Sequence, residues 1–246
     1  MIKGNNSRIH PESEKISRFV GNIFQLDFKF IFNLLLFAAF MFAAIGTLFS
    51  YGLGRRKLLF ITKPFIVPVL IGFYVLNSNN VFALIVIALI CAFLGDVFLM
   101  WSHRRIYFIS GMIAFFIMHI LFIIFILNYQ IQVSLLALPA HLMSLVYLLL
   151  GGMVFVLLYK NLHEFKIPIV FYILALLGLS YFCFINVIVH KSEIAFAQYL
   201  GSLLFIISDF MLAIVCFRKP FRNCGILVAA TYILAMIFLI AGFMCC

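Results

Sequence analysis

The sequence predicts an all-α membrane protein, a polytopic transmembrane bundle of eight helices. Hydrophobic residues make up 67% of its 246 residues and charged residues only 10%, a balance that excludes a soluble globule of this size. The apolar residues fall into eight runs, each near the length of about 20 residues that crosses a bilayer. Basic clusters lie in every second connection between these runs. Composition, run length and charge pattern therefore agree on the fold class.

The chain begins with a polar segment, residues 1–27, which lacks the apolar core and cleavage site of a signal peptide. We expect it to form a tail, with an interfacial helix at its end, before a transmembrane domain at residues 28–246. The predicted helices of that domain cover roughly residues 28–50, 60–76, 81–100, 107–127, 134–158, 168–189, 195–217 and 224–244. An even number of helices places both termini on one side of the membrane.

Positive charges set the predicted orientation. The loops after the first, third, fifth and seventh helices are basic, whereas Lys191 is the only Lys or Arg of the opposite loops. By the positive-inside rule the basic loops are cytoplasmic, and we give them more weight than the cations of the N-terminal segment, which then lie outside. We expect an integral multi-pass protein of the cell (inner) membrane. The net charge of +10 indicates topology and not nucleic-acid binding.

Two aspartates lie inside the apolar runs, Asp96 in the third predicted helix and Asp209 in the seventh. A carboxyl group in hydrocarbon costs several kcal/mol, so it usually faces a bundle interior or a wet cavity and serves a function there. Asp96 precedes Arg104 by eight residues and Asp209 precedes Arg218 by nine. At 1.5 Å per residue both carboxyls lie about 12–13 Å from the basic end. The structural alternative is a neutral aspartate that only joins two helices.

The surroundings of the two aspartates are similar. His119 follows Asp96 by 23 residues, and Tyr232 follows Asp209 by the same interval. This spacing is compatible with two four-helix repeats in parallel orientation. Because the two carboxyls lie at one depth, they are candidates for a shared site.

Further candidates lie at the same depth. Lys63 begins the second predicted helix, and is either a lysine that reaches the headgroups without a further task or a partner for a phosphate or carboxylate. His119 shares a helical face with Gly111 and is either a packing residue or part of the site. The Cys, His and carboxylate residues of the sequence do not have the spacing of metal ligands. We therefore expect no metal and no cofactor.

Paired carboxyls in apolar surroundings suit acid–base chemistry. Two such groups titrate separately, so that one holds a proton while the other is charged. Glycosidases use this arrangement: one group protonates the bond, and the other supports an oxocarbenium-like state or positions water. The sequence therefore favours an enzyme that cleaves an acid-labile bond in a lipid.

Short motifs around these residues occur in a fixed order along the chain. They are Thr62-Lys63-Pro64; Leu94-Gly95-Asp96 with Leu99-Met100; Phe108, Gly111, Phe115 and His119; Gly201, Phe205, Ser208-Asp209 and Ala213; and Thr231-Tyr232. In order and spacing they resemble the YhhN-like lysoplasmalogenase family of eight-helix membrane proteins. The resemblance covers the second to eighth predicted helices. It departs from the family pattern at Met236, where Gln is frequent.

The resemblance implies a membrane hydrolase that cleaves the vinyl ether bond of lysoplasmalogens. The products are a fatty aldehyde and glycerophospho-ethanolamine or glycerophospho-choline. Asp96 and Asp209 would be the general acid and base. Lys63 would pair with the lipid phosphate, while His119 and Tyr232 would orient a carboxyl or water. The predicted substrate-binding residues are Lys63, His119, Tyr232 and Ser208. The substrate would be a lysophospholipid from the bilayer, and no protein partner is implied.

Three other interpretations stay open. A proton-coupled transporter also uses paired intramembrane carboxyls, although these helices have few Gly or Pro interruptions at matching positions. An intramembrane aspartyl protease uses two helix-borne aspartates, but Phe93 replaces the first glycine of its Gly-x-Gly-Asp motif, and Ser208 stands where Tyr should precede the second Asp. In the third interpretation both aspartates are purely structural.

Overall fold

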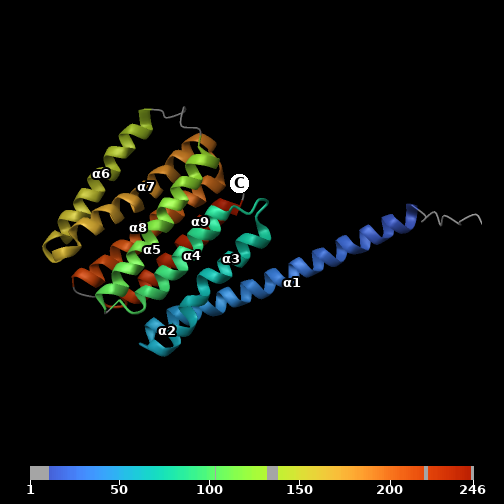
Figure 1. The fold of residues 1–246 in the computed structure, drawn as a ribbon, viewed down its shortest axis with the longest axis horizontal. Helices are drawn as coiled ribbons and strands as arrows, with labels where there is room; N and C mark the ends of the chain where they lie inside the picture. The colour runs from blue at the N-terminus through green and yellow to red at the C-terminus, as the bar shows by residue number, and fades with distance from the viewer. Residues whose placement is uncertain (1–10, 103, 132–137, 219–220, 245–246) are drawn as a thin grey trace, which may run out of the picture.

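The computed structural model describes residues 11–102, 104–131, 138–218 and 221–244, and this part of the chain is helical with no strand. Its helices are α1 (Pro11–Gly52), α2 (Arg56–Thr62), α3 (Ile66–Asn77), α4 (Ala83–Leu99), α5 (Arg105–Phe125), α6 (Leu138–Leu158), α7 (Lys166–His190), α8 (Glu193–Phe217) and α9 (Cys224–Met244). Short turns of 3-10 or π type extend or join them at Lys63–Phe65, Ile126–Gln130, Tyr159–Asn161 and His163–Phe165. Figure 1 shows the helices gathered in one bundle.

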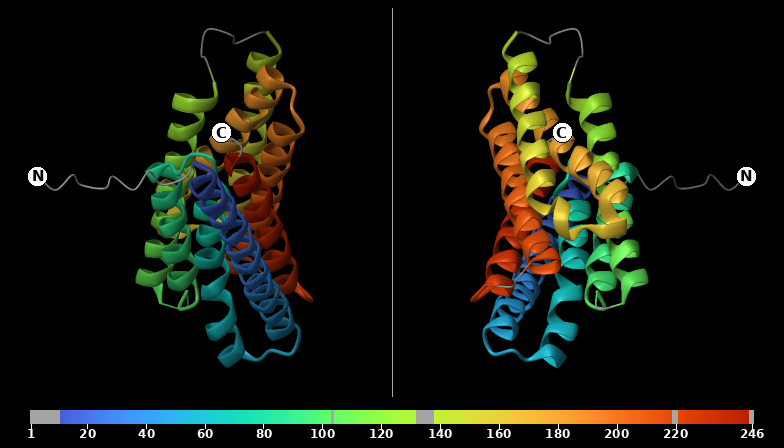
Figure 2. Two further views of the ribbon diagram at one scale, coloured as in Figure 1. Left: turned by 90° about the vertical axis from the view of Figure 1, so that its right-hand side faces the viewer. Right: turned by 90° about the vertical axis from the view of Figure 1, so that its left-hand side faces the viewer.

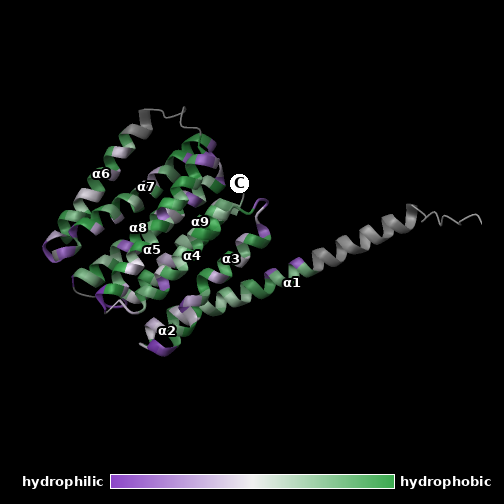
Figure 3. Ribbon diagram, viewed as in Figure 1, coloured by the Kyte–Doolittle hydropathy of each residue, from purple (hydrophilic) through white to green (hydrophobic). Residues whose placement is uncertain are grey.

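The described residues form eight helical spans, because α2, a 3-10 turn and α3 together make up one of them. Within the described residues seven spans are long and apolar enough to cross a membrane, and the eighth, α4, is apolar but shorter. At 1.5 Å per residue the 17 residues of α4 are about 26 Å long, close to the roughly 30 Å of a hydrocarbon core. Figure 3 shows the apolar spans with hydrophilic residues at their ends. The predicted eight-helix bundle is therefore confirmed.

Helix α1 begins earlier than the first predicted helix. It starts at Pro11, so the helix includes the second part of the predicted tail, while its membrane-spanning part begins at Phe28. Its C-terminal part contacts α2, α3 and α9, and its N-terminal part projects away from the bundle (Figure 1). Residues 1–10 of the predicted tail lie outside the described residues, as do residues 134–137 of the fifth predicted helix.

The second span is interrupted where the sequence predicts a single helix. A 3-10 turn at Lys63–Phe65 separates α2 from α3, and Pro64 lies in this turn. Proline has no backbone N–H and clashes with the preceding helical turn, so the α-helix cannot continue through it. The interruption positions Lys63 beside α4, where it contributes to the site described below.

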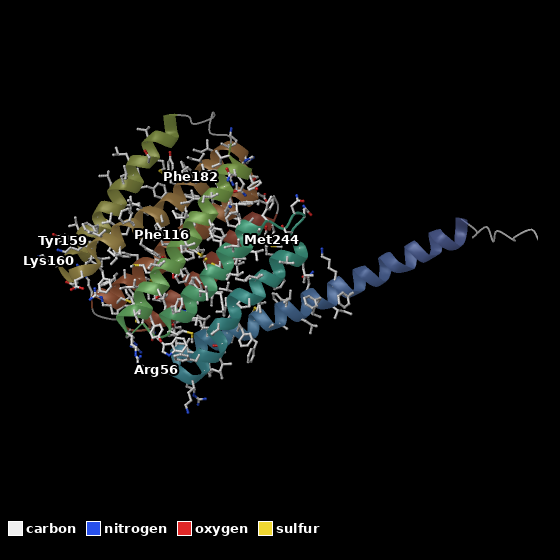
Figure 4. The ribbon with its side chains drawn as sticks, viewed as in Figure 1. Arg56, Phe116, Tyr159, Lys160, Phe182 and Met244 are labelled. Atoms are coloured by element: carbon white, nitrogen blue, oxygen red, sulfur yellow. The ribbon has the colours of Figure 1, made fainter. Side chains whose placement is uncertain are left out.

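The four basic connections lie at one end of the bundle. The α1–α2, α4–α5, α6–α7 and α8–α9 connections lie along the lower left side of the tilted bundle in Figure 1, where Figure 4 labels Arg56 and Lys160, with Met244 on the opposite side; Figure 2 shows the same bundle from two further sides. Helices α4 and α8 both run toward the basic end, as two parallel repeats require. Which side of the membrane this end faces stays a prediction from the positive-inside rule.

Helix contacts in the second half follow those in the first. Helix α4 packs against α3 and α5, and α8 packs correspondingly against α7 and α9. Glycines make the closest of these approaches possible: a Cβ atom at Gly111 of α5 would lie 2.9 Å from Cγ of Leu99 in α4. A Cβ atom at Gly201 of α8 would lie 2.7 Å from the backbone nitrogen of Leu239 in α9. This packing agrees with two four-helix repeats.

We expect Gly201→Ala to destabilise the bundle by about 1–3 kcal/mol, because the added methyl group meets backbone atoms that cannot rotate away. The matched control is Gly152→Ala on α6, where an added Cβ has no heavy atom within 4 Å. Thermal unfolding of both purified variants in detergent checks this. Equal melting temperatures would show that α8 and α9 are not packed as closely as described.

Candidate active site

Asp96 is bonded to side chains from two other parts of the chain. The Nζ atom of Lys63 lies 3.2 Å from one carboxyl oxygen of Asp96, and the Tyr232 hydroxyl donates a hydrogen bond of 2.6 Å to the other. Only 2% of the Asp96 side chain is exposed, so a carboxylate here needs both partners. The structure thus brings together three residues that the sequence predicts for the site.

Asp209 has a different environment. The Tyr172 hydroxyl of α7 donates a hydrogen bond to its Oδ2 atom. Among the described residues Asp209 has no ion-pair partner, in contrast to Asp96. The surroundings of the two carboxyls meet at Phe205, which packs against Tyr232 beside Asp96 and against His119, the neighbour of Tyr172. The site therefore holds one carboxyl with a counter-ion and one with a hydroxyl partner only.

Aromatic rings fill the space between the two carboxyls. The Tyr232 ring lies 6.1 Å from that of Phe115 and 5.6 Å from that of Phe205, both edge-on. The His119 ring lies 5.0 Å from Phe205 and 5.6 Å from Tyr172. This packing joins α5, α7, α8 and α9 around the site.

His119 is fully buried and contacts neither carboxyl directly. Its Nδ1 atom lies 2.6 Å from the carbonyl oxygen of Phe115. A carbonyl only accepts, so Nδ1 carries the proton and Nε2 is left with a lone pair. Nε2 has no hydrogen-bond partner among the described residues. His119 therefore supports the Tyr172 ring from within the packed interior.

Ser208 is turned away from the site. Its hydroxyl donates a hydrogen bond of 3.0 Å to the carbonyl oxygen of Val228, which joins α8 to α9. It does not line the cavity described next. The prediction that Ser208 binds substrate finds no contact to support it, whereas its neighbour Asp209 lies on the cavity wall.

An apolar cavity opens beside Asp209, between helices α5, α6, α7 and α8 and the end of α4. It has about 780 Å³ of empty space, including its mouth. Its polar side chains are Asp209 and Tyr172, with Cys216 nearby, and the rest of the wall is aliphatic or aromatic. Asp96, Lys63 and Tyr232 do not line it. Its lining residues are Leu99, Phe108, Met112, Phe115, Val154, Leu158, Ile169, Tyr172, Ile173, Leu176, Leu177, Ile206, Asp209, Phe210, Leu212, Ala213, Cys216 and Phe217.

Aromatic residues and cations surround the cavity at the basic end of the bundle. The Phe108 ring lies 5.6 Å from both Phe165 and Phe217. The Arg105 guanidinium lies 5.4 Å from the centre of the Phe165 ring and pairs with Glu164. Aromatic rings beside cations are typical of the headgroup region of a membrane protein.

Tyr172 is the site residue that the sequence analysis missed. A tyrosine in an apolar helix attracts no notice, but its position does carry a signal. Tyr172 follows Lys166 by six residues, just as Lys63 follows Lys57 by six. In the proposed repeat, α7 corresponds to the span that carries Lys63, so the two side chains occupy matching places beside their aspartates.

Metal binding finds no support in the side-chain geometry. Among the residues that the structure describes, no three His, Cys, Asp or Glu side chains are grouped so that they could hold a metal ion. The absence of a cofactor stays a prediction.

Comparison with known proteins gives one match. A family model, described as the YhhN family, matches residues 58–243. This range contains both aspartates, Lys63, Tyr172 and Tyr232. Neither the curated proteins nor the solved structures gave a match.

We expect Lys63→Met to destabilise the bundle by about 3 kcal/mol or more, because it leaves the Asp96 charge buried without a counter-ion. The double variant Lys63→Met with Asp96→Asn removes both charges and should recover most of this loss. Thermal unfolding in detergent measures both, with Lys57→Met at an exposed position of the same end as the control. Additive effects of the two substitutions would contradict a coupled ion pair.

Proposed function

Because the chain belongs to the YhhN family, which is the lysoplasmalogenase family, we propose that it is a membrane hydrolase of the vinyl ether bond of lysoplasmalogens. Its substrates are lysoplasmenyl-ethanolamine or lysoplasmenyl-choline. Its products are a fatty aldehyde and glycerophospho-ethanolamine or glycerophospho-choline. One observation carries the proposal: Asp209 and its hydrogen-bond partner Tyr172 form the polar part of the wall of an apolar cavity.

The reaction needs an acid, an anion and one water molecule. A proton adds to the β-carbon of the vinyl ether, and an oxocarbenium ion results. Water then adds to the carbon bonded to the ether oxygen, and the hemiacetal collapses to the aldehyde and the free glycerol hydroxyl. The proton given in the first step is recovered from the attacking water. No redox step and no covalent enzyme intermediate is required.

We assign the acid to Asp209, because an acid must touch the carbon that it protonates and Asp209 is the carboxyl on the cavity wall. The Tyr172 hydroxyl bonds Oδ2 of Asp209, which leaves Oδ1 for the transferred proton. Once it has given up this proton, Asp209 is a carboxylate beside the oxocarbenium ion. It then accepts a proton from the attacking water, so one residue acts as acid and base in turn.

Asp96 supplies the permanent negative charge. The Lys63 ammonium and the Tyr232 hydroxyl hold it as a carboxylate away from the cavity. In this proposal a carboxylate in the same site as Asp209 favours positive charge that develops on the substrate. Lys63 is then a partner of Asp96, and the phosphate binds instead to cations at the cavity mouth such as Arg105.

We expect purified wild type to release free aldehyde from a lysoplasmalogen and to leave an ester lysophospholipid intact. Asp209→Asn should lower aldehyde release by at least about 100-fold, because the amide cannot transfer the proton. The double variant Lys63→Met with Asp96→Asn removes the negative charge of Asp96 without leaving Lys63 unpaired. Its rate of aldehyde release measures the contribution of that charge. Each variant is first checked by thermal unfolding. If the folded wild type releases no aldehyde, the hydrolase proposal is wrong, and proton-coupled transport becomes the next function to test.

We expect Tyr172→Phe to lower kcat about 10- to 100-fold, the value of a hydrogen bond to a charged group, with a smaller change in KM. The phenyl ring keeps the packing against His119, so the melting temperature should change little. Tyr129→Phe removes a hydroxyl from an exposed tyrosine that lines neither the cavity nor the second hollow described below, and is the matched control. Unchanged kcat in Tyr172→Phe would show that the hydroxyl only fills space.

A further inference from the structure

A second hollow runs along α6 and α7. It has about 880 Å³ of empty space, including the side open to its surroundings. Its wall is apolar apart from three hydroxyl-bearing residues, and we call it the α6–α7 groove. Its lining residues are Ser144, Tyr147, Leu148, Gly151, Gly152 and Phe155 of α6, and Val170, Ile173, Leu174, Leu177, Gly178 and Tyr181 of α7.

The α6–α7 groove adjoins the cavity beside Asp209. Ile173 and Leu177, one turn apart on α7, line both hollows. A Cβ atom at Gly151 would lie 2.9 Å from Cδ1 of Leu177, so the glycine leaves room for this side chain. Leucine and isoleucine side chains change rotamer without movement of a helix. The two hollows therefore meet at a boundary made of two aliphatic side chains.

The groove has the length of one lipid chain. From Phe155 to Ser144 it follows eleven residues of α6, about 16 Å at 1.5 Å per residue. One leaflet accounts for about half of the roughly 30 Å hydrocarbon core. The groove leads away from the basic end, which is the direction that a hydrocarbon chain takes from its headgroup.

The far end of the groove is polar. The Tyr147 hydroxyl is hydrogen-bonded to Ser180 at 2.9 Å, and Ser202 donates to Ser180 at 2.9 Å. These hydroxyls are buried between α6, α7 and α8. A methyl end gains nothing from contact with them, so the hydroxyl cluster marks the end of the apolar surface.

We propose that the α6–α7 groove takes the hydrocarbon chain of the lysophospholipid whose vinyl ether lies against Asp209. The identity of this chain rests on the proposed function. Because bilayer lipid is as apolar as the groove, the chain gains little affinity from it. The groove acts by admitting or excluding the chain, and it sets the chain length that the enzyme accepts.

The test is Gly152→Phe, which places a ring in the groove where an added Cβ has no heavy atom within 4 Å. Val156→Phe is the control, on the same helix, 71% exposed and outside both hollows. For a long chain of about 18 carbons, kcat/KM should fall at least about tenfold in Gly152→Phe only. A short chain of about 8 carbons, which ends inside the cavity, should be hydrolysed equally by all three proteins. Equal losses for both chains, or no loss, overturn the proposal.

A binding experiment separates this proposal from the hydrolase proposal. An ester lysophospholipid with a photoreactive diazirine at its chain end is irradiated with the wild type, and the labelled residues are mapped by mass spectrometry. We expect labels on groove residues that excess unlabelled long-chain lysophospholipid removes and that Gly152→Phe loses. Such labels without any aldehyde release would contradict the proposed hydrolase activity and support lipid binding in the α6–α7 groove. Aldehyde release with labels spread over the outer helix faces would support the hydrolase activity and contradict chain binding in the groove.

Discussion

A carboxylate can stay inside a membrane bundle only if its charge is paired and its oxygens are bonded. Asp96 meets this requirement with Lys63 and Tyr232, which come from the second span and from the last helix. The ion pair thus joins distant parts of the chain around α4. The proline-containing turn that carries Lys63 and the packing of α9 near α4 both serve this contact. The rest of the site is arranged around this ion pair.

The second aspartate shows what happens when the counter-ion is replaced. Tyr172 takes the place beside Asp209 that Lys63 takes beside Asp96, in a half of the bundle with the same helix contacts. A hydroxyl bonds the carboxyl without neutralising it. A repeated framework therefore yields two unlike carboxyls, one held as an ion pair and one on a cavity wall. Two carboxyls in identical surroundings could not serve one as a permanent anion and the other as a proton donor.

The sequence predicts the helices well because each apolar run is long enough to cross a bilayer, and the two buried aspartates are visible as acids in hydrocarbon. Side-chain direction is harder to predict. Ser208 and Asp209 are neighbours, but successive residues point about 100° apart on a helix, and only Asp209 faces the cavity. Tyr172 was missed because tyrosine is common in apolar helices. The partner of Lys63 also depends on a turn that Pro64 creates, which a hydrophobic run does not reveal.

The position of Asp209 within one leaflet is compatible with the chemistry proposed for it. It lies about 12–13 Å from the basic end, and so below the headgroups but within one leaflet. A vinyl ether bond lies between the phosphate and the hydrocarbon chain of its lipid, and so in the same leaflet, which means that the substrate need not leave the bilayer. Phe108 and Phe217 line the cavity near the basic end, with ring centres 5.6 Å apart, and in the proposed reaction water enters from this side because the rest of the wall is apolar. A hydrocarbon chain that fills the deeper part of the bundle would close the other side, so that one water molecule meets the oxocarbenium ion beside Asp209.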